Sequence, residues 1–568
     1  MEAAEERKGL LESNPDDDGE SIHSFASSST LTPPTPLTPS IDEDEKFCPP
    51  GDEPIFTATQ PSQQSWLKTP LTPAGITTLF LRLLSAVTIT LLPSPLQPLL
   101  TTQARTPRKL HATSYLDGLR GVAALIVLHS HFLTNWFYPL RSGYLSSETD
   151  TYVLQLPILR LFYSGRASVS VFFVVSGFAL SYKPLSLLRK PSTKARVLEV
   201  LSSSVFRRFL RLWMPIVLGT FISALLANYE LYTPVPSRGE IIPPTFPTLR
   251  EQLWDWWVEL SAFWFPWRSV DGNAPEGIVY NGHLWTIPVE FYGSFVVFAS
   301  VLGMSSVRKA WVRLVLGLGL MGWSLRGGRW DVALFLGGVV CAEWSLMLGE
   351  WKEVGLPIHV SWVASSNNLV RVARKAFSAL YLAARPFKTP AIALSLLTSL
   401  FLLSYAGESA SPGHFHAFLI PYTPSIFEPI SLGHEHFWLC IGALLLLFTL
   451  TSSPFLQKPF TWSFPQYLGD ISYSLYIVHG MVLFTLGTAM QERWTGIIGE
   501  QKWVDNGMGE LVEVVVAVEP EARVWWNAFW GAAAVDWLVV FWAADLFWRV
   551  CDRRVPGWGR WVEGFVGR

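Results

Sequence analysis

Long apolar segments constrain this chain more than any other feature of its sequence. Ten of them have the length that a helix needs to cross about 30 Å of hydrocarbon. Half of the 568 residues are hydrophobic and only 15% are charged, whereas soluble domains average about 25%. The sequence therefore predicts an all-α, polytopic transmembrane helix bundle of about ten spans, near residues 118–138, 167–183, 208–228, 284–304, 311–325, 331–349, 389–405, 437–453, 471–489 and 524–548.

The remaining residues divide the chain into four parts. Residues 1–75 are rich in Ser, Thr, Pro and acidic residues, which predicts a disordered cytosolic tail. Residues 76–112 are expected to form an apolar interfacial or re-entrant segment and a linker, because prolines interrupt the apolar run. Residues 113–550 form the transmembrane domain, and residues 551–568 form a cytosolic tail.

The orientation follows from the distribution of Lys and Arg among the connections. Alternate connections are basic, and the one at 184–211 is the richest. The intervening connections at 229–283, 406–436 and 490–523 carry more acids than bases. Basic connections remain in the cytosol, so both termini are predicted to be cytosolic. If the apolar run near 75–100 crossed the membrane, the N-terminus would lie outside.

Neither nucleic acid nor metal is an expected partner. The formal net charge of −2 provides no basic surface for nucleic acid. The four cysteines show no metal-ligand spacing, and neither do the outer-loop histidines His414, His416, His434 and His436. His479 lies in the middle of a span, where core packing and a role in a pathway are comparably supported.

Ionisable residues within the spans are functional candidates, because a charge in hydrocarbon costs at least about 2.5–3.5 kcal/mol. Arg120 and His131 lie eleven residues apart in the first span, about three helical turns, so they share a face. His129 is nine residues from Arg120 and points to the opposite face. The spacing favours His131 as a functional residue; a buried histidine bonded to a neighbouring helix is the alternative.

Arg208 and Arg211 are three residues apart, on one face at the cytosolic end of the third span. Together with Arg120 they predict a cationic cluster at one depth. Arginine side chains bind phosphate in a bidentate manner, which suits a nucleotide-bearing donor such as a coenzyme A thioester. Ordinary flanking charge at a membrane boundary is the alternative.

Glu290 lies at a depth similar to that of His131, about 9–10 Å from the outer boundary. A histidine that removes a hydroxyl proton needs a group to orient it, and Glu290 is the predicted partner. A structural glutamate paired with an arginine or a tryptophan N–H is the alternative.

Five ordered motifs resemble those of the acyltransferase 3 family of polytopic membrane acyltransferases. The resemblance covers about residues 113–550 and rests on YLDGLRGVAALIVLHSHF, FFVVSGFALS, RRFLRLWMP, HLWTIPVEFYGSF and ISYSLYIVH. It implies about ten helices around a cavity and transfer of an acyl group, commonly acetyl, from a cytosolic coenzyme A thioester to a hydroxyl of a sugar, lipid or secondary metabolite. Pro288-Val289 replaces the pair that usually precedes the family's glutamate. No C-terminal esterase-like domain is expected.

The resemblance also implies roles for individual residues. Arg120, Arg208 and Arg211 correspond to the family's donor-side arginines, His131 to its histidine and Glu290 to its acidic position. His131 is then a general base or a transient acyl carrier. No permanently bound cofactor is expected, and acyl-coenzyme A is the donor substrate.

Two other classes of protein fit part of the pattern. A non-catalytic transporter of a small anion or an acylated product would use the same arginine and histidine positions along a permeation path. The sequence shows no inverted repeat, which would have supported a transporter. A scaffold or sensor that has lost its activity is the third class, and the intact Arg-to-His spacing argues against it.

Overall fold

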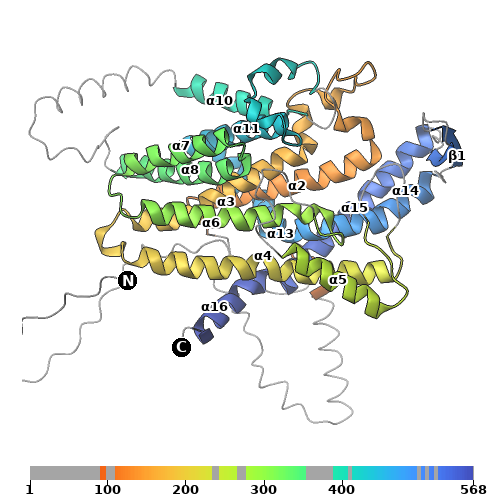
Figure 1. Cartoon of the computed structure of the whole chain (residues 1–568), viewed down its shortest axis with the longest axis horizontal. Helices are drawn as coiled ribbons and strands as arrows, with labels where there is room; N and C mark the ends of the chain where they lie inside the picture. The colour runs from red at the N-terminus through yellow and green to blue at the C-terminus, as the bar shows by residue number, and fades with distance from the viewer. Residues whose placement is uncertain are drawn as a thin grey trace, which may run out of the picture. The chain divides into compact units, whose positions relative to one another are not determined.

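The computed structural model describes residues 90–97, 109–232, 242–264, 277–353, 388–406, 412–495, 500–505, 511–516 and 522–566. Helices dominate these residues, and most run roughly side by side in Figure 1. The segment predicted to be a disordered tail, 1–75, and residues 76–89 lie outside the described residues. Residues 90–97 are described and contact the last long helix, α15 (Ala522–Val550): the Arg549 guanidinium donates to the carbonyl oxygens of Thr90 and Leu92.

Each of the ten predicted spans corresponds to a helix. Eight helical segments of the described chain are long and apolar enough to cross a membrane. They contain α2 (Ser114–Trp136), α3 (Gly165–Leu187), α4 (Arg196–Asn228), α6 (Thr286–Met304), α8 (Trp330–Glu353), α11 (Gly433–Ser452), α13 (Ser463–Val482) and α15. The other two predicted spans are shorter helices, α7 (Ala310–Arg326) and α10 (Lys388–Leu403). The predicted polytopic α-helical bundle is confirmed.

Shorter elements complete the described chain. They are helices α5 (Leu249–Phe263), α12 (Pro454–Gln457), α14 (Thr488–Thr495) and α16 (Val555–Val566), and strands β1 (Glu500–Asp505) and β2 (Leu511–Val516). The strands pair antiparallel, with Glu500 opposite Val516, between α14 and α15. This hairpin lies in the acidic connection at 490–523, for which the sequence predicted no secondary structure.

Helices α2 and α13 pack closely because glycines line their crossing. A Cβ atom added to Gly121 would collide with the backbone of Gly469, and one added to Gly469 would lie 2.5 Å from the Asp117 carbonyl oxygen. Small residues let helices in a membrane approach until their backbones are in contact. Gly177 of α3 and Gly338 of α8 serve the same purpose in the neighbouring helix pair. The N-terminal half of α2 is therefore held against α13, which fixes where the ionisable residues of the first span point.

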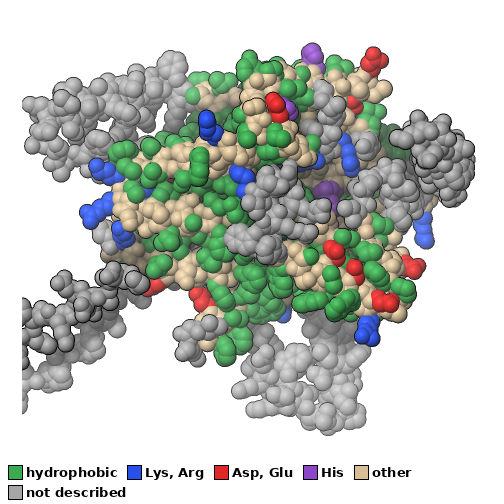
Figure 2. Space-filling model, in the orientation of Figure 1, with side chains coloured by type: hydrophobic (Ala, Val, Ile, Leu, Met, Phe, Trp, Pro, Cys, Tyr) green, Lys and Arg blue, Asp and Glu red, His purple; other side chains and the backbone are tan. Residues whose placement is uncertain are grey.

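The outer surface of the bundle is largely apolar. Trp254, Trp323, Leu394 and Leu538 are each more than 60% exposed, as expected for side chains that face lipid. Figure 2 shows hydrophobic side chains across one face, a group of Lys and Arg at the left edge, and Asp and Glu gathered over α5 on the right. Apolar side chains thus separate two polar ends on this face.

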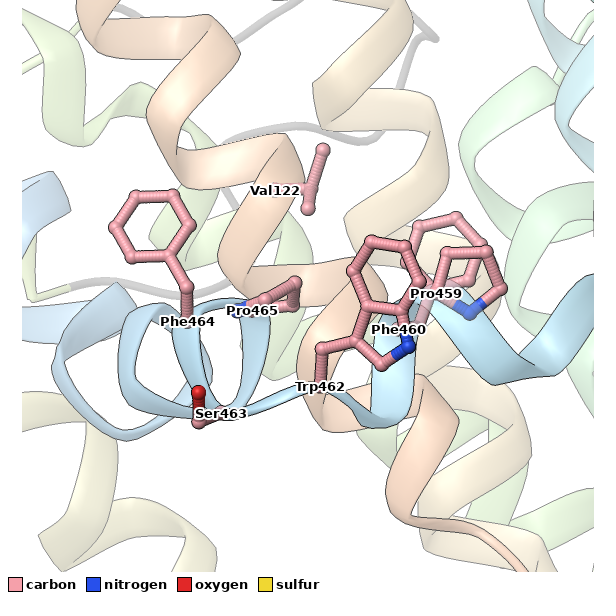
Figure 3. A pocket seen from close by; sticks show the side chains of 7 residues that line it. All are labelled: Val122, Pro459, Phe460, Trp462, Ser463, Phe464 and Pro465. Carbon is pink, nitrogen blue, oxygen red and sulfur yellow. The ribbon is translucent and has the colours of Figure 1, made fainter.

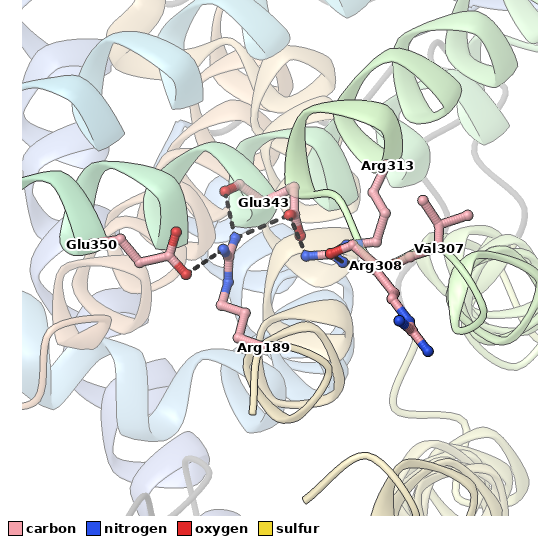
Figure 4. Close-up of polar contacts among 6 residues, drawn as sticks. All are labelled: Arg189, Val307, Arg308, Arg313, Glu343 and Glu350. Atoms are coloured by element: carbon pink, nitrogen blue, oxygen red, sulfur yellow. Dashed lines mark hydrogen bonds and ion pairs between the residues drawn. The ribbon is translucent and has the colours of Figure 1, made fainter. Parts of the chain in front are cut away.

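A buried ion network joins the segment that follows α3 to helices α7 and α8 (Figure 4). Glu343 of α8 accepts from Arg313 at 2.8 Å and from Arg189 at 3.0 Å. Arg313 also donates to the carbonyl oxygen of Val307. Glu350 lies about two helical turns farther along α8. It pairs with Arg189 at 2.6 Å but its side chain is 47% exposed, whereas that of Glu343 is 2% exposed. Glu343 is therefore the carboxylate that compensates two buried guanidinium charges.

Glu343→Gln is expected to lower the free energy of unfolding by about 3–5 kcal/mol, because it leaves buried arginines without a counter-charge. Unfolding in mixed detergent micelles, followed by circular dichroism, measures the change. Glu350→Gln is the matched control and should cost less than about 1 kcal/mol, as exposed ion pairs do. Equal effects of the two substitutions would contradict the assigned role of Glu343.

Candidate active site

Helix α13 contacts three of the helices on which the sequence singled out ionisable residues. Its segment ISYSLYIVH turns Ser472, Tyr473, Tyr476 and His479 toward α2, α4 and α6. Tyr473 donates to the Leu212 carbonyl oxygen at 2.5 Å. This motif therefore borders Arg120 at one end and His131 at the other.

Arg120 of α2 is held by α13. Its Nε donates to Ser472 Oγ, and a terminal nitrogen donates to the Gly469 carbonyl oxygen, both at 3.0 Å. The close α2–α13 packing brings that carbonyl within reach. The Arg120 side chain remains 29% exposed, so these partners do not enclose it completely.

Arg208 of α4 is held by α6. Its Nε donates to Ser294 Oγ at 2.9 Å, and a terminal nitrogen pairs with Glu290 at 3.1 Å. Ser176 of α3 donates to the other carboxylate oxygen of Glu290 at 3.3 Å. Glu290 thus joins α3, α4 and α6.

Arg211 lies one helical turn after Arg208 and is close enough to Arg120, Arg208 and Asp552 to interact with their charges. Asp552 in turn accepts a hydrogen bond from Ser474 of α13 at 3.4 Å. The structure therefore brings together the three arginines that the sequence singled out. We call Arg120, Arg208 and Arg211 the arginine cluster.

Three imidazoles meet farther along α13. His131 Nδ1 lies 3.0 Å from His283 Nε2, a hydrogen-bond distance. The His479 ring centroid is 5.2 Å from that of His131 and 4.9 Å from that of His283. His479 is fully buried, whereas His131 and His283 are partly buried and so retain some accessibility. We call these residues the histidine cluster.

His129 lies outside the histidine cluster. Its ring stacks between Phe162 and Trp537, with centroids 4.5 Å apart in each case. Neither ring nitrogen has a hydrogen-bond partner within the described part of the chain. Arg120 and His131 both face α13, whereas His129 faces α15. The helical spacing of the first span predicted this division.

The structure gives Glu290 partners other than the predicted one. Its carboxylate oxygens accept from Arg208 and Ser176, and the hydrogen-bond partner of His131 is His283. The alternative of a glutamate paired with an arginine therefore describes the geometry of Glu290. Equal depth in the membrane does not bring two side chains together when they project from different sides of their helices.

Besides Asp552, His283 is a residue of the site that the sequence analysis missed. It belongs to η8 (Gly282–Trp285), immediately before α6. The sequence did offer a reason to consider His283, because it is an ionisable residue at the start of the HLWTIPVEF motif. Its position at the end of the predicted span, however, did not distinguish it from the histidines of the loops.

The histidine cluster has the composition of a metal site, although no metal was expected from the sequence. One ligand atom from each residue lies within 4.8 Å of the others. Zinc bound by nitrogen at about 2.0–2.1 Å requires each lone pair to point at the ion. At 3.0 Å the facing nitrogens of His131 and His283 instead point at each other, so one donates a proton to the other. As it stands, the arrangement is a hydrogen-bonded pair beside a third imidazole.

An apolar hollow of about 560 Å³ opens near the start of α13 (Figure 3). Its walls are Val122, Pro459, Phe460, Trp462, Ser463, Phe464 and Pro465. None of these side chains titrates. Val122 is two residues from Arg120, about 200° around α2, so the hollow opens away from the arginine side. The hollow therefore offers no ionisable side chain, unlike the two polar clusters.

Comparison with known proteins agrees with this geometry. The family model described as an acyltransferase domain matches residues 113–507. The O-acetyltransferase PaAT-1 of Phomopsis amygdali is 31% identical over 76% of this chain and 82% of its own. Acyltransferase R4 of a Phoma species is 24% identical over 69% of this chain and 87% of its own length. Acyltransferase clz18 of Cochliobolus lunatus is 23% identical over 67% of this chain and 85% of its own length. No solved structure matches.

The apolar helices and these matches together show an integral membrane acyltransferase. The chain belongs to the acyltransferase 3 family. It is an O-acyltransferase, and its partners are an acyl donor, an acceptor and the lipid bilayer.

Glu290 and Arg208 are expected to be energetically coupled. In a double-mutant cycle with Glu290→Gln and Arg208→Gln, measured by unfolding in mixed micelles, the coupling should be about 0.5–3 kcal/mol. The matched cycle of Glu290→Gln with His131→Gln should be additive within about 0.5 kcal/mol, because these side chains share no partner. Strong coupling in the second cycle would contradict the partners assigned to Glu290.

Proposed function

We propose that this acyltransferase moves an acetyl group from cytosolic acetyl-coenzyme A to a hydroxyl of a sugar, lipid or secondary metabolite. One observation carries the proposal: α13 binds Arg120 of the arginine cluster at Ser472 and lies beside the histidine cluster at His479. Ser472 and His479 are seven residues apart, a rise of about 10 Å. An extended pantetheine arm bridges that distance, so phosphates at the arginines leave the thioester near the imidazoles.

The arginine cluster is the proposed donor end. Guanidinium groups bind phosphate oxygens in pairs, and coenzyme A carries several phosphates. Arg120 and Arg208 are already oriented by Ser472, Gly469, Ser294 and Glu290, so little side-chain entropy is lost when the donor binds. The basic connections on this side support a cytosolic position for this end of the bundle and for both termini.

His131 is the proposed general base. Its imidazole takes the proton of the acceptor hydroxyl while the oxygen attacks the thioester carbonyl carbon. The carbon–sulfur bond then breaks, and the imidazolium returns the proton to the departing thiolate. The products are an acetate ester and free coenzyme A. Glu290, in this scheme, acts through Arg208 at the donor end and not on His131.

The proposal also explains why a transporter is the weaker interpretation. A permeation path needs charged groups that release their cargo, whereas Arg120 and Arg208 are each fixed by two hydrogen bonds. The relative from Phomopsis amygdali is named as an O-acetyltransferase, which favours acetyl as the transferred group.

Acetyl-coenzyme A should raise the melting temperature of the purified protein by mass action, since it binds only the folded state. At a concentration about 100 times the dissociation constant, binding contributes about 2.7 kcal/mol. Arg211→Gln should abolish most of this ligand-dependent shift, whereas Arg308→Gln, an exposed arginine outside the cluster, should leave it intact. An unchanged shift in Arg211→Gln would contradict the donor site.

His131→Ala should lower coenzyme A release by about 100-fold or more, the usual contribution of a general base, while leaving the donor-induced thermal shift in place. His129→Phe is the control, because it preserves the stacking between Phe162 and Trp537, and its activity should match that of the wild type. Release is measured with a thiol reagent. Activity retained in His131→Ala would remove His131 from the mechanism.

A further inference from the structure

We propose that His283 is a positioning residue that fixes the tautomer of His131, and that Asn281 and Gly480 hold His283 in place for this task. The inference rests on the proposed function, because a fixed tautomer matters only if His131 acts as the base. Neither Asn281, His283 nor Gly480 was singled out by the sequence.

The hydrogen bond between His131 and His283 determines which nitrogen of His131 is basic. A neutral imidazole has one N–H and one lone pair. If His131 Nδ1 donates to His283 Nε2, then His131 Nε2 keeps its lone pair for the acceptor hydroxyl. If the bond runs in the opposite direction, Nε2 carries the proton and His131 is not a base at that atom. The groups around His283 therefore determine the direction of this hydrogen bond.

Asn281 favours the productive direction. Its Nδ2 donates to the Ile477 carbonyl oxygen at 2.8 Å, a bond that only the amide nitrogen can make, so Oδ1 points away from that carbonyl. Oδ1 is buried and has no partner among the described residues. A Cβ atom added to Gly480 would lie 2.8 Å from His283 Nδ1 and 3.5 Å from Asn281 Oδ1. Both atoms therefore border the space that the missing side chain leaves open. Oδ1 makes no hydrogen bond to Nδ1, but its partial negative charge faces the same space and so favours a proton on Nδ1 over a second lone pair there. A proton on Nδ1 leaves Nε2 of His283 as the lone pair.

His283 is otherwise well fixed. The Tyr476 hydroxyl donates to its carbonyl oxygen, and the Phe484 ring stacks on its imidazole with centroids 5.4 Å apart and planes 14° apart. Gly480 leaves room for the ring, since any larger residue would contact Nδ1. These contacts come from the end of α13 and the π-helical turn η13 (Leu483–Gly487) that follows it.

His479 completes the arrangement. Its Nδ1 lies 3.1 Å from the Leu475 carbonyl oxygen, which only accepts, so Nδ1 carries the proton. Its Nε2 lone pair is buried and has no hydrogen-bond partner among the residues that the structure describes. The histidine cluster thus contains fixed acceptors rather than fixed positive charges, which favours the cationic form that His131 takes during the reaction.

The first experiment compares His283→Leu with His283→Gln. The Gln amide oxygen offers an acceptor near the position of His283 Nε2, whereas Leu offers none. Acetyl-coenzyme A is the donor; 1-octanol, octyl glucoside and water are the hydroxyl probes. His283→Leu should lower kcat by about 100-fold or more with donor binding unchanged. His283→Gln should retain at least about a tenth of the wild-type kcat, because positioning requires an acceptor and not a second base.

Gly480→Ala tests the same contact without changing an ionisable group. The added methyl group should displace the His283 ring and lower kcat by about 10-fold or more, while the donor-induced thermal shift stays. Gly303→Ala is the matched control, because its added Cβ meets nothing within 4 Å. Full activity in Gly480→Ala, or equal loss in both variants, would contradict the positioning role.

The outcomes separate this inference from the proposed function. Wild-type protein that releases no coenzyme A with any probe would overturn both. An active wild type that needs His131 but tolerates His283→Leu would overturn only the positioning role. Complete loss in His283→Gln together with loss of one bound metal ion per chain, measured by mass spectrometry, would replace positioning with metal ligation.

Discussion

The contact between α2 and α13 is the interaction on which the rest of the site depends. Glycines on both helices remove the side chains that would separate them, and Arg120 then reaches a backbone carbonyl of the opposite helix. In lipid, such packing and hydrogen bonding provide the driving force that the hydrophobic effect provides in water. Because α2 is fixed at this crossing, the position of His131, about three turns later, follows from helical geometry alone.

Helix α13 gives the site its internal order. At one end of this helix, Ser472 binds Arg120. In the middle, Tyr473 binds a backbone carbonyl of α4, and Tyr476 binds Thr286 of α6. Farther along, His479 lies beside the other two imidazoles. Rigid elements hold functional side chains more precisely than loops do. The bundle therefore keeps two chemically different groups at a constant separation, which suits a long donor with its charge at one end and its reactive bond at the other.

Some of the site was readable from the sequence because it depends on one helix at a time. The 100° rotation per residue separated His131 from His129, and similar depth grouped Arg120 with Arg208 and Arg211. The partner of Glu290 was not readable in that way. Glu290 and His131 lie at similar depth, but the structure pairs Glu290 with Arg208 and Ser176, because lateral distance between helices depends on how they pack. His283 was missed for the same reason: it becomes significant only beside His131.

The sequence by itself determined the membrane location, the helices, the faces that their ionisable residues occupy and the family. These properties follow from segment length, hydropathy, helical period and ordered motifs. Only the tertiary structure decided which helix faces meet. It determined that His131 contacts His283 and that Arg208 forms an ion pair with Glu290. It also determined that Gly480 leaves space for the His283 imidazole. The physical reason is that hydropathy and period act along one helix, whereas the contacts between helices depend on the shapes of surfaces that come from distant parts of the chain.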